Sequence, residues 1–133
     1  MRVVTAGALL TLAVAIAAAE PIGVARIIDG DTLELTSGER IRVLDVDTPE
    51  LHGARCNREF ALAMRAKERL EELVASGRRF SISRQGHDRY RRVLAEVSIG
   101  GEDVAALLIR EGLALPYRPG QSREQPGPWC GEP

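Results

Sequence analysis

Apolar and polar residues follow a strand-like pattern in three short stretches in the first part of the chain. Residues 23–28 form an apolar, β-branched run, and residues 32–36 and 40–46 alternate on either side of a turn at 37–38. Alternation with a period of two is typical of strands that bury one face. The pattern predicts three β-strands, the last two joined as a hairpin, and Pro49 ends the third because proline restricts the backbone before it.

The pattern changes to a helical period after this hairpin. Apolar residues recur at spacings of three and four over residues 60–74, and Gly77 is typical of the position just beyond a helix end. Two further strands at 79–84 and 92–99 and a second helix between Asp103 and Gly112 complete the predicted elements.

The predicted order is β-β-β-α-β-β-α. Five short strands with a helix between the third and the fourth are the plan of a five-stranded OB-fold-like Greek-key barrel, mainly β with two helices (α+β). The 133 residues are enough for one domain and too few for two ordinary ones. We expect a signal peptide at 1–19, the folded domain at 20–115 and an irregular Pro/Gly-rich tail at 116–133.

The first nineteen residues differ in composition from the predicted core. Arg2 gives a positive start, residues 3–16 carry no charge, and three alanines at 17–19 form a small-residue cleavage pattern. The apolar run is shorter than the roughly 20 residues of a membrane-spanning helix. A cleavable secretory signal is therefore predicted, which implies a secreted or periplasmic protein, with an uncleaved anchor as the alternative.

Composition indicates a globular chain that is not strongly basic. Hydrophobic residues make up 44% and charged residues 28% of the sequence, and the formal net charge is −1. A strong nucleic-acid binder usually has a basic balance. Attraction to a polyanion must then be local, from a bound cation and the arginine-rich segment 84–92, which could otherwise be a solvated face.

The two cysteines, Cys56 and Cys130, both lie after the predicted signal peptide. Export to an oxidising compartment favours one disulfide between them, and two unpaired thiols are the alternative. The bond would close a loop of about 75 residues and contribute on the order of 4 kcal/mol. A catalytic cysteine is disfavoured because neither histidine falls in a nucleophile motif.

Acidic and arginine side chains concentrate in three segments: 29–32, 42–50 and 88–92. The hairpin can bring Asp31 and Asp47 to the same end of the barrel, where two adjacent carboxylates repel unless a cation lies between them. Oxygen ligands favour Ca²⁺ or Mg²⁺. The guanidinium groups of Arg42 and Arg92 suit phosphate oxygens. Together these features predict a metal-dependent nuclease.

Simpler structural roles for the same residues are the alternatives. Residues 29–32 could form only a turn, since Asp and Gly are favoured there. An EF-hand is excluded because Leu33 and Leu35 occupy positions that need oxygen ligands. Arg42 and Arg92 could serve only as ion-pair partners of the acidic residues that hold the barrel closed.

The three segments resemble the signature blocks of the staphylococcal nuclease (thermonuclease) family. The blocks read Asp29-Gly30-Asp31-Thr32, Arg42 through Glu50 and Asp88 through Ala95, and the likeness runs from about Gly23 to Ala114. The resemblance implies an SNase-like OB-fold and calcium-dependent hydrolysis of DNA and RNA, preferably single-stranded, with little sequence specificity. It also suggests a monomer that cleaves the 5′ P–O bond and leaves 3′-phosphate ends.

The resemblance also implies roles for individual residues. Asp31 and Asp47 would be direct calcium ligands, with the backbone carbonyl of Thr48. Glu50 would hold the attacking water and act as general base.

Other residues would contact the substrate. Arg42 and Arg92 would bind the scissile phosphate, and Arg89 and Tyr90 match positions that contact the terminal phosphate of the nucleotide. Tyr117 would lie beside the base.

The sequence departs from the family pattern in several places. Arg91 and Val93 occupy positions where the family often has glycine, and residues 116–133 replace its closing helix. The acidic balance predicts weaker substrate affinity and strong salt sensitivity. A non-catalytic OB-fold module that binds single-stranded nucleic acid is the alternative function, although the full set of site residues argues against it. An envelope protein in which calcium has only a structural role is a third hypothesis.

Overall fold

A computed structural model describes residues 21–117 and 128–131 of the chain. The predicted signal peptide and most of the predicted tail lie outside the described residues. Within them the protein is mainly β with two helices, as the sequence predicts. The elements are β1 (Val24–Asp29), β2 (Thr32–Leu35), β3 (Arg40–Val43), β4 (Val46–Asp47), α1 (Asn57–Ala75), β5 (Phe80–His87), β6 (Val93–Ile99), β7 (Glu102–Asp103), α2 (Val104–Arg110) and β8 (Leu115–Pro116).

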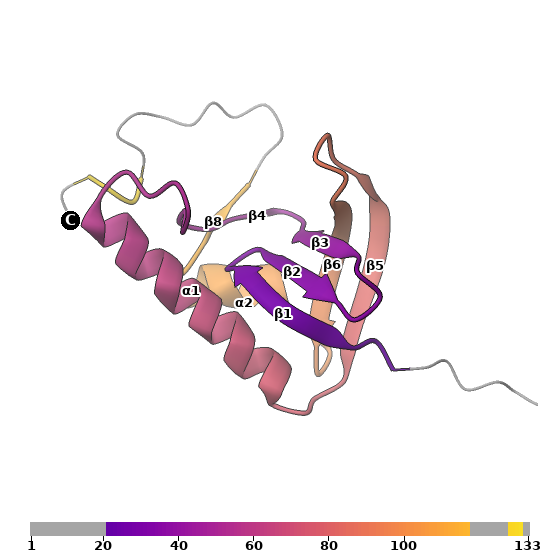
Figure 1. The fold of residues 1–133 in the computed structure, drawn as a ribbon. Helices are drawn as coiled ribbons and strands as arrows, with labels where there is room; N and C mark the ends of the chain where they lie inside the picture. The colour runs from indigo at the N-terminus through magenta and orange to yellow at the C-terminus, as the bar shows by residue number, and fades with distance from the viewer. Residues whose placement is uncertain (1–20, 118–127, 132–133) are drawn as a thin grey trace, which may run out of the picture.

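The main sheet has the strand order of an OB-fold (Figure 1). Antiparallel pairs join β1 to β2 and β2 to β3, and β3 then runs parallel to β6, which pairs antiparallel with β5. The short β7 also pairs with β6. The path runs from β1 to β5, and within the described part of the chain no pairing joins these two ends. The OB-like fold is confirmed, with a sheet that is not fully closed.

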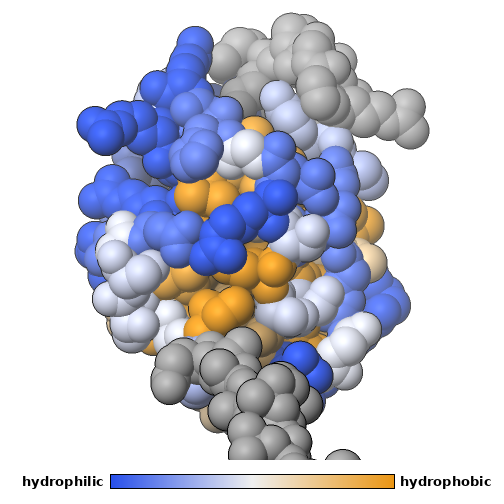
Figure 2. All heavy atoms as spheres, turned by 90° about the vertical axis from the view of Figure 1, so that its right-hand side faces the viewer, coloured by the Kyte–Doolittle hydropathy of each residue, from blue (hydrophilic) through white to orange (hydrophobic). Residues whose placement is uncertain are grey.

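The core lies inside the curved sheet and is covered by the two helices. Helix α1 lies across β1, and α2 contacts β6 (Figure 1). The core is built from aliphatic side chains, including Leu33, Ile41, Leu70, Val97 and Leu108, each fully buried. On the face that carries β5, hydrophilic side chains surround and cross a patch of hydrophobic atoms (Figure 2).

The predicted third strand, residues 40–46, is broken in the structure. β3 ends at Val43, and Asp45 adopts a left-handed conformation with φ 61° before β4 begins at Val46. Aspartate tolerates this conformation better than most residues, so a turn forms where the apolar alternation suggested a continuous strand. β4 pairs with β8, a two-residue strand at Leu115–Pro116 that the sequence did not predict. The turn redirects the chain toward residues 47–50.

Helix α1 begins three residues earlier than its apolar pattern suggested. Cys56 is its N-cap, with Sγ 3.3 Å from the Glu59 backbone nitrogen that donates to it. Cys56 is bonded to Cys130, with a Cα–Cα separation of 5.9 Å, so the expected disulfide is confirmed in the structure. Trp129 is buried beside it. The bond therefore holds residues 128–131 against the start of α1.

β5 extends to His87, past the predicted end at 84. An irregularity in its pairing between Arg84 and Gly86 lets the strand bend. Neither helix of the described residues is long and apolar enough to span a bilayer.

Candidate active site

Two cavities adjoin at the end of the sheet where the three acidic and arginine-rich segments meet. The smaller, about 60 Å³, is lined by Asp29, Asp31, Arg42, Thr48, Pro49, Glu50 and Arg92. The larger, about 690 Å³, is lined by Arg42, Val43, Leu44, Asp45, Asp88, Arg89, Tyr90, Arg92, Leu94 and Tyr117. Arg42 and Arg92 line both, so two guanidinium groups stand between a small acidic cavity and a wider one that contains tyrosines.

Asp31 lies in the turn between β1 and β2 and is tied to the neighbouring segments. Its Oδ1 accepts a hydrogen bond from Thr32 Oγ1 and its Oδ2 one from Thr48 Oγ1, each at 2.9 Å. Its backbone oxygen accepts from the Val43 amide at 2.9 Å. Gly30 allows this turn to approach α1, because a Cβ there would lie 2.7 Å from the Ala66 Cβ. The carboxylate is therefore fixed in place by the fold.

Asp29 also lines the small cavity. Burial raises the pKa of Asp29 to about 7, and the neighbouring carboxylate of Asp31 adds to the effect. Two adjacent carboxylates in a partly enclosed cavity are the arrangement that a cation would relieve. Asp29 belongs to the first signature block, but the resemblance assigned no role to its side chain. Its spacing of two residues from Asp31 was the signal that could have identified it.

Arg42 projects from β3 and is held by the turn that follows it. Nη1 donates to the Val43 carbonyl, and Nη2 donates to the Val46 carbonyl at 2.8 Å. Nη2 also lies 3.3 Å from Asp31 Oδ2. The break between β3 and β4 thus supplies carbonyl groups that orient the guanidinium, a role that an unbroken strand would not provide.

Arg92 is positioned by the loop between β5 and β6. Asp88 accepts hydrogen bonds from the backbone amides of Tyr90 and Arg92 at 2.9 and 3.0 Å, and its Oδ2 lies 2.7 Å from Arg92 Nε. Burial opposes the charged form, but these hydrogen bonds and the Arg92 charge keep the pKa of Asp88 below its usual value. Arg92 Nη1 also donates to Thr32 Oγ1 at 3.3 Å. The guanidinium is therefore joined to the β1–β2 turn that carries Asp31.

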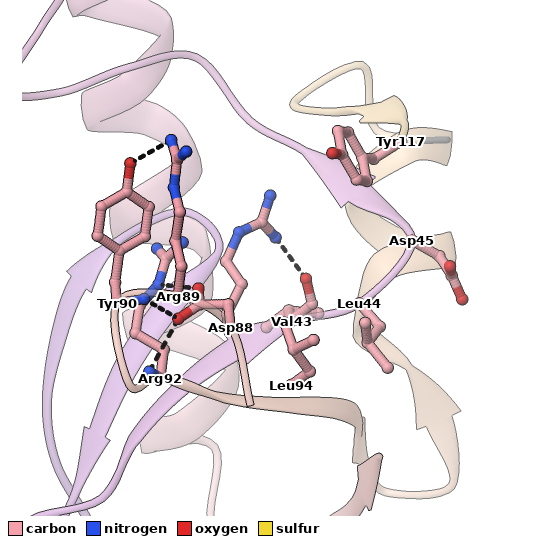
Figure 3. A pocket seen from close by; sticks show the side chains of 10 residues that line it. Val43, Leu44, Asp45, Asp88, Arg89, Tyr90, Arg92, Leu94 and Tyr117 are labelled. Atoms are coloured by element: carbon pink, nitrogen blue, oxygen red, sulfur yellow. Dashed lines mark hydrogen bonds and ion pairs between the residues drawn. The ribbon is translucent and has the colours of Figure 1, made fainter. Parts of the chain in front are cut away.

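The aromatic side chains stand on two sides of the larger cavity (Figure 3). Arg89 Nη2 donates to the Tyr90 hydroxyl at 2.6 Å, and the Arg89 guanidinium carbon lies 4.8 Å from the centre of the ring. Tyr117 lies across the opening, where its amide donates to the Asp45 carbonyl at 3.0 Å. Both tyrosines are exposed, so their rings are accessible to a ligand.

The remaining predicted residues divide between the cavity and the strands. Glu50 and Thr48 line the small cavity with Asp31. Asp47 is in β4, where it pairs with Leu115, and it lines neither cavity. In residues 21–117 and 128–131 no group of three or more His, Cys, Asp or Glu side chains is close enough to hold a metal ion.

The donors in the small cavity suit a hard cation. Asp29, Asp31 and Glu50 supply carboxylates, Thr48 supplies further oxygen, and no sulfur or imidazole is present. Calcium and magnesium prefer such oxygen ligands, and calcium accepts irregular sets that include carbonyl groups and water. By donor type these residues therefore suit calcium better than a transition metal, although within the described residues their carboxylates are not gathered closely enough to form a metal site.

Glu59, fully buried in the first turn of α1, was not predicted as a site residue. It contacts the segment that carries Glu50, because its Oε1 accepts from the Glu50 amide at 3.3 Å. The spacing Cys56-x-x-Glu59 resembles that of a capping box and was the available signal. That spacing indicates a helix start, but not which loop the carboxylate contacts.

Comparisons with known proteins match most of the chain to one family. The model described as staphylococcal nuclease homologue matches residues 40–127. An uncharacterized endonuclease of Haemophilus influenzae is 31% identical over 71% of this chain and 51% of the relative. The micrococcal nuclease of Shigella flexneri is 31% identical over 71% of this chain and 57% of the relative. The succinoglycan biosynthesis protein ExoI of Rhizobium meliloti is 38% identical, with 74% and 53% covered. The chain thus spans about half the length of these relatives.

Proposed function

The chain belongs to the staphylococcal nuclease family, and from this premise we propose that it is an exported, calcium-dependent nuclease. It would hydrolyse phosphodiester bonds of DNA and RNA with little sequence specificity and a preference for single strands. The observation that supports this most directly is the small cavity in which Asp31, Thr48 and Glu50 lie together with Arg42 and Arg92.

Calcium would be held in the small cavity by the carboxylate of Asp31 and the carbonyl of Thr48. The family resemblance implies Asp47 as a further ligand, which would have to reach the ion from β4, since Asp47 lines neither cavity here. When bound, calcium would supply positive charge to the scissile phosphate and a template for the reacting groups. The second carboxylate of the β1–β2 turn, Asp29, would add negative charge beside the ion. Calcium binding is supported by the oxygen-rich donor set and by the repulsion between Asp29 and Asp31.

The arginines would do most of the phosphate binding. Arg42 and Arg92 would place their guanidinium groups on the non-bridging oxygens and stabilise the negative charge that develops there. Both are oriented in advance, Arg42 by the carbonyls of the β3–β4 turn and Arg92 by Asp88. Groups that are already oriented need little reorganisation during the reaction.

Glu50 would accept a proton from the attacking water as the new P–O bond forms. The departing 5′ oxygen would take a proton from solvent water, and the products would carry 3′-phosphate and 5′-hydroxyl ends. The larger cavity would hold the nucleotide, with Arg89 and Tyr90 near a phosphate and Tyr117 beside a base. Contacts to phosphates and to the faces of bases carry little sequence information, which would account for broad specificity.

Cleavage of end-labelled single-stranded DNA and RNA by the purified protein, titrated with calcium, tests the proposal. We expect cleavage that requires calcium, stops with a chelator, and leaves 3′-phosphate ends. Glu50→Gln should retain substrate binding and lose turnover by about 10²- to 10⁴-fold, whereas Glu68→Gln on the exposed side of α1 should not change turnover.

A folded protein that leaves both substrates intact at millimolar calcium would refute the proposed activity. If that protein still bound single strands, the alternative of a non-catalytic binding module would be supported instead. Export, the monomeric state and a secreted or periplasmic location are also proposals. N-terminal sequencing of the protein recovered from culture medium and periplasm would test the predicted cleavage after residue 19.

A further inference from the structure

Glu59 is a fully buried carboxylate that none of the expected catalytic roles uses. It lies in the first turn of α1, on the side that faces the segment 50–55. Isolated buried carboxylates are unfavourable, and they persist when hydrogen bonds and positive charge compensate for lost hydration. The hydrogen-bond partners of Glu59 therefore indicate which part of the chain its carboxylate fixes in place.

The two oxygens of Glu59 bind the two ends of the segment 50–55. Oε1 accepts from the Glu50 amide at 3.3 Å, and Oε2 accepts from the Arg55 amide at 2.8 Å. Arg55 Nε lies 3.5 Å from Oε2 and adds a positive charge. One residue of helix α1 thus fixes the backbone at two points: at Glu50, beside the small cavity, and at Arg55, just before α1 begins.

The surroundings of Glu59 keep the carboxylate in the charged form. Burial opposes ionisation, but hydrogen bonds from the Arg55 and Glu50 amides and the Arg55 charge keep the pKa of Glu59 below its usual value. Cys130 Sγ of the disulfide lies 3.7 Å from Oε2, and Trp129 is buried nearby. A charged acceptor forms stronger hydrogen bonds than a neutral one, which suits it to fixing a loop.

We propose that Glu59 is a positioning residue for Glu50: its buried carboxylate anchors the Glu50 backbone so that the catalytic side chain is held in the small cavity. This inference rests on the proposed function, because it assigns Glu59 a part in the same reaction. The competing explanation is that Glu59 only stabilises the start of α1. A capping role would change stability without selectively changing turnover.

Glu59→Gln tests the difference. It keeps the volume of the side chain, but its NH₂ group can no longer accept, so the amide of either Glu50 or Arg55 loses its acceptor. The control is Asp103→Asn at the N-cap of α2, where Oδ1 accepts from the Ala106 amide at 2.7 Å. Both variants replace a carboxylate by an amide at a helix start, and only one is next to the cavity.

We expect Glu59→Gln to lower kcat by roughly 10- to 100-fold with KM changed by less than about threefold, since small misplacement of a reacting group mainly affects turnover. Hydrogen exchange of the Glu50 amide, measured by NMR, should become about tenfold faster. Asp103→Asn should leave both quantities within about twofold of wild type.

Distinct results separate the failure of this inference from that of the proposed function. Wild-type protein that cleaves nucleic acid while Glu59→Gln retains its kcat overturns only the positioning role. Equal losses of kcat in both variants, in proportion to stability, overturn it as well. If Glu59→Gln does not fold, hydrogen exchange of the Glu50 amide in the wild type replaces that test. An amide that exchanges as fast as in an unstructured chain would show that the contact with Glu59 is not formed, and would overturn the inference. Folded wild-type protein without any cleavage overturns the proposed function itself.

Discussion

Arg42 Nη2 lies 3.3 Å from Asp31 Oδ2, and the side chains are only 14% and 11% exposed. A residue expected to bind phosphate is thus ion-paired with one expected to bind a cation. In a partly buried setting such a pair gives each group a partner in the absence of substrate. A bound cation would share the Asp31 carboxylate with Arg42, so the affinity for the cation and the orientation of the guanidinium are linked.

Calcium should stabilise the protein through Asp31. A ligand present at 100 times its dissociation constant adds about 2.7 kcal/mol to the free energy of unfolding. We therefore expect the melting temperature of wild type to rise with calcium concentration in thermal scans. Asp31→Asn should abolish the rise, whereas Glu68→Gln on the outer face of α1 should retain it. A rise of the same size in Asp31→Asn would place the cation elsewhere.

Replacement of Arg92 by lysine should impair catalysis although the charge is retained. Lysine cannot form the planar, two-pronged contact with phosphate, nor reproduce both the Asp88 and Thr32 contacts. Loss of one oriented donor typically costs about 10²- to 10³-fold in kcat. Steady-state kinetics should show this for Arg92→Lys, while Arg84→Lys, paired with Glu39 on the surface, stays within about twofold. Similar kcat values for both variants would contradict the role of Arg92.

The protein with glycine at position 91 should be more stable than the protein with alanine there. Arg91 has a φ of 65°, a left-handed conformation that costs a residue with a Cβ roughly 1–2 kcal/mol. Glycine avoids this cost but has more freedom in the unfolded chain, by about 0.5–1 kcal/mol. The free energy of unfolding in urea should therefore be higher for Arg91→Gly than for Arg91→Ala, by up to about 1.5 kcal/mol. The opposite order would show that the loop relaxes when the side chain is removed.

Loss of the Cys56–Cys130 bond should destabilise the protein substantially. The bond joins residues 74 positions apart, and a closed loop of this length is worth about 4 kcal/mol by the chain-entropy model. The double variant Cys56→Ser/Cys130→Ser should show that loss in urea unfolding. Adding a reductant should lower the midpoint of wild type and leave the double variant unchanged. A wild-type midpoint that does not respond to complete reduction would contradict the expectation.

Acid should remove the contribution of Asp88 to stability. Its pKa is lowered in the folded state, so the charged form stabilises the protein at pH values above the usual pKa of 3.8. That contribution is lost as the pH falls through the lower folded-state value. The difference in unfolding free energy between wild type and Asp88→Asn should therefore be constant near neutral pH and shrink below about pH 4. A difference that grows toward acid would contradict the sign.

Strand and helix positions were predictable from the sequence because local periodicity reflects burial. The apolar residues of α1 and β6 keep the helical and strand periods over many residues, and both elements occur as expected. The break at Asp45 was not predictable in this way, since Leu44 and Val46 continue an apolar pattern through a turn. β4 pairs with β8, whose residues lie about 70 positions further along the chain, and local periodicity carries no information about such distant pairs.

Which residues line the cavity could likewise be predicted only in part, because it depends on tertiary packing. The motifs identified Asp31, Arg42, Glu50 and Arg92, which do lie together. They contain Asp29 but did not indicate its part in the cavity, and its raised pKa follows from burial and from a neighbour's charge. The predicted role of Glu50 follows from the motif alone, but the Glu59 contact that holds its backbone could be found only once α1 was placed against the loop.

The parallel pairing of β3 with β6 sets Ile41 opposite Val93 and Arg42 opposite Leu94. A growing polypeptide that has emerged only as far as α1 already contains Asp31, Arg42 and Glu50, yet it lacks both Arg92 and the strand that completes the sheet around them. Pairing segments so distant in sequence costs loop entropy and comes late in folding. The proposed hydrolytic centre therefore cannot form until almost the whole domain has been synthesised. Nascent chains would be inert toward nucleic acids.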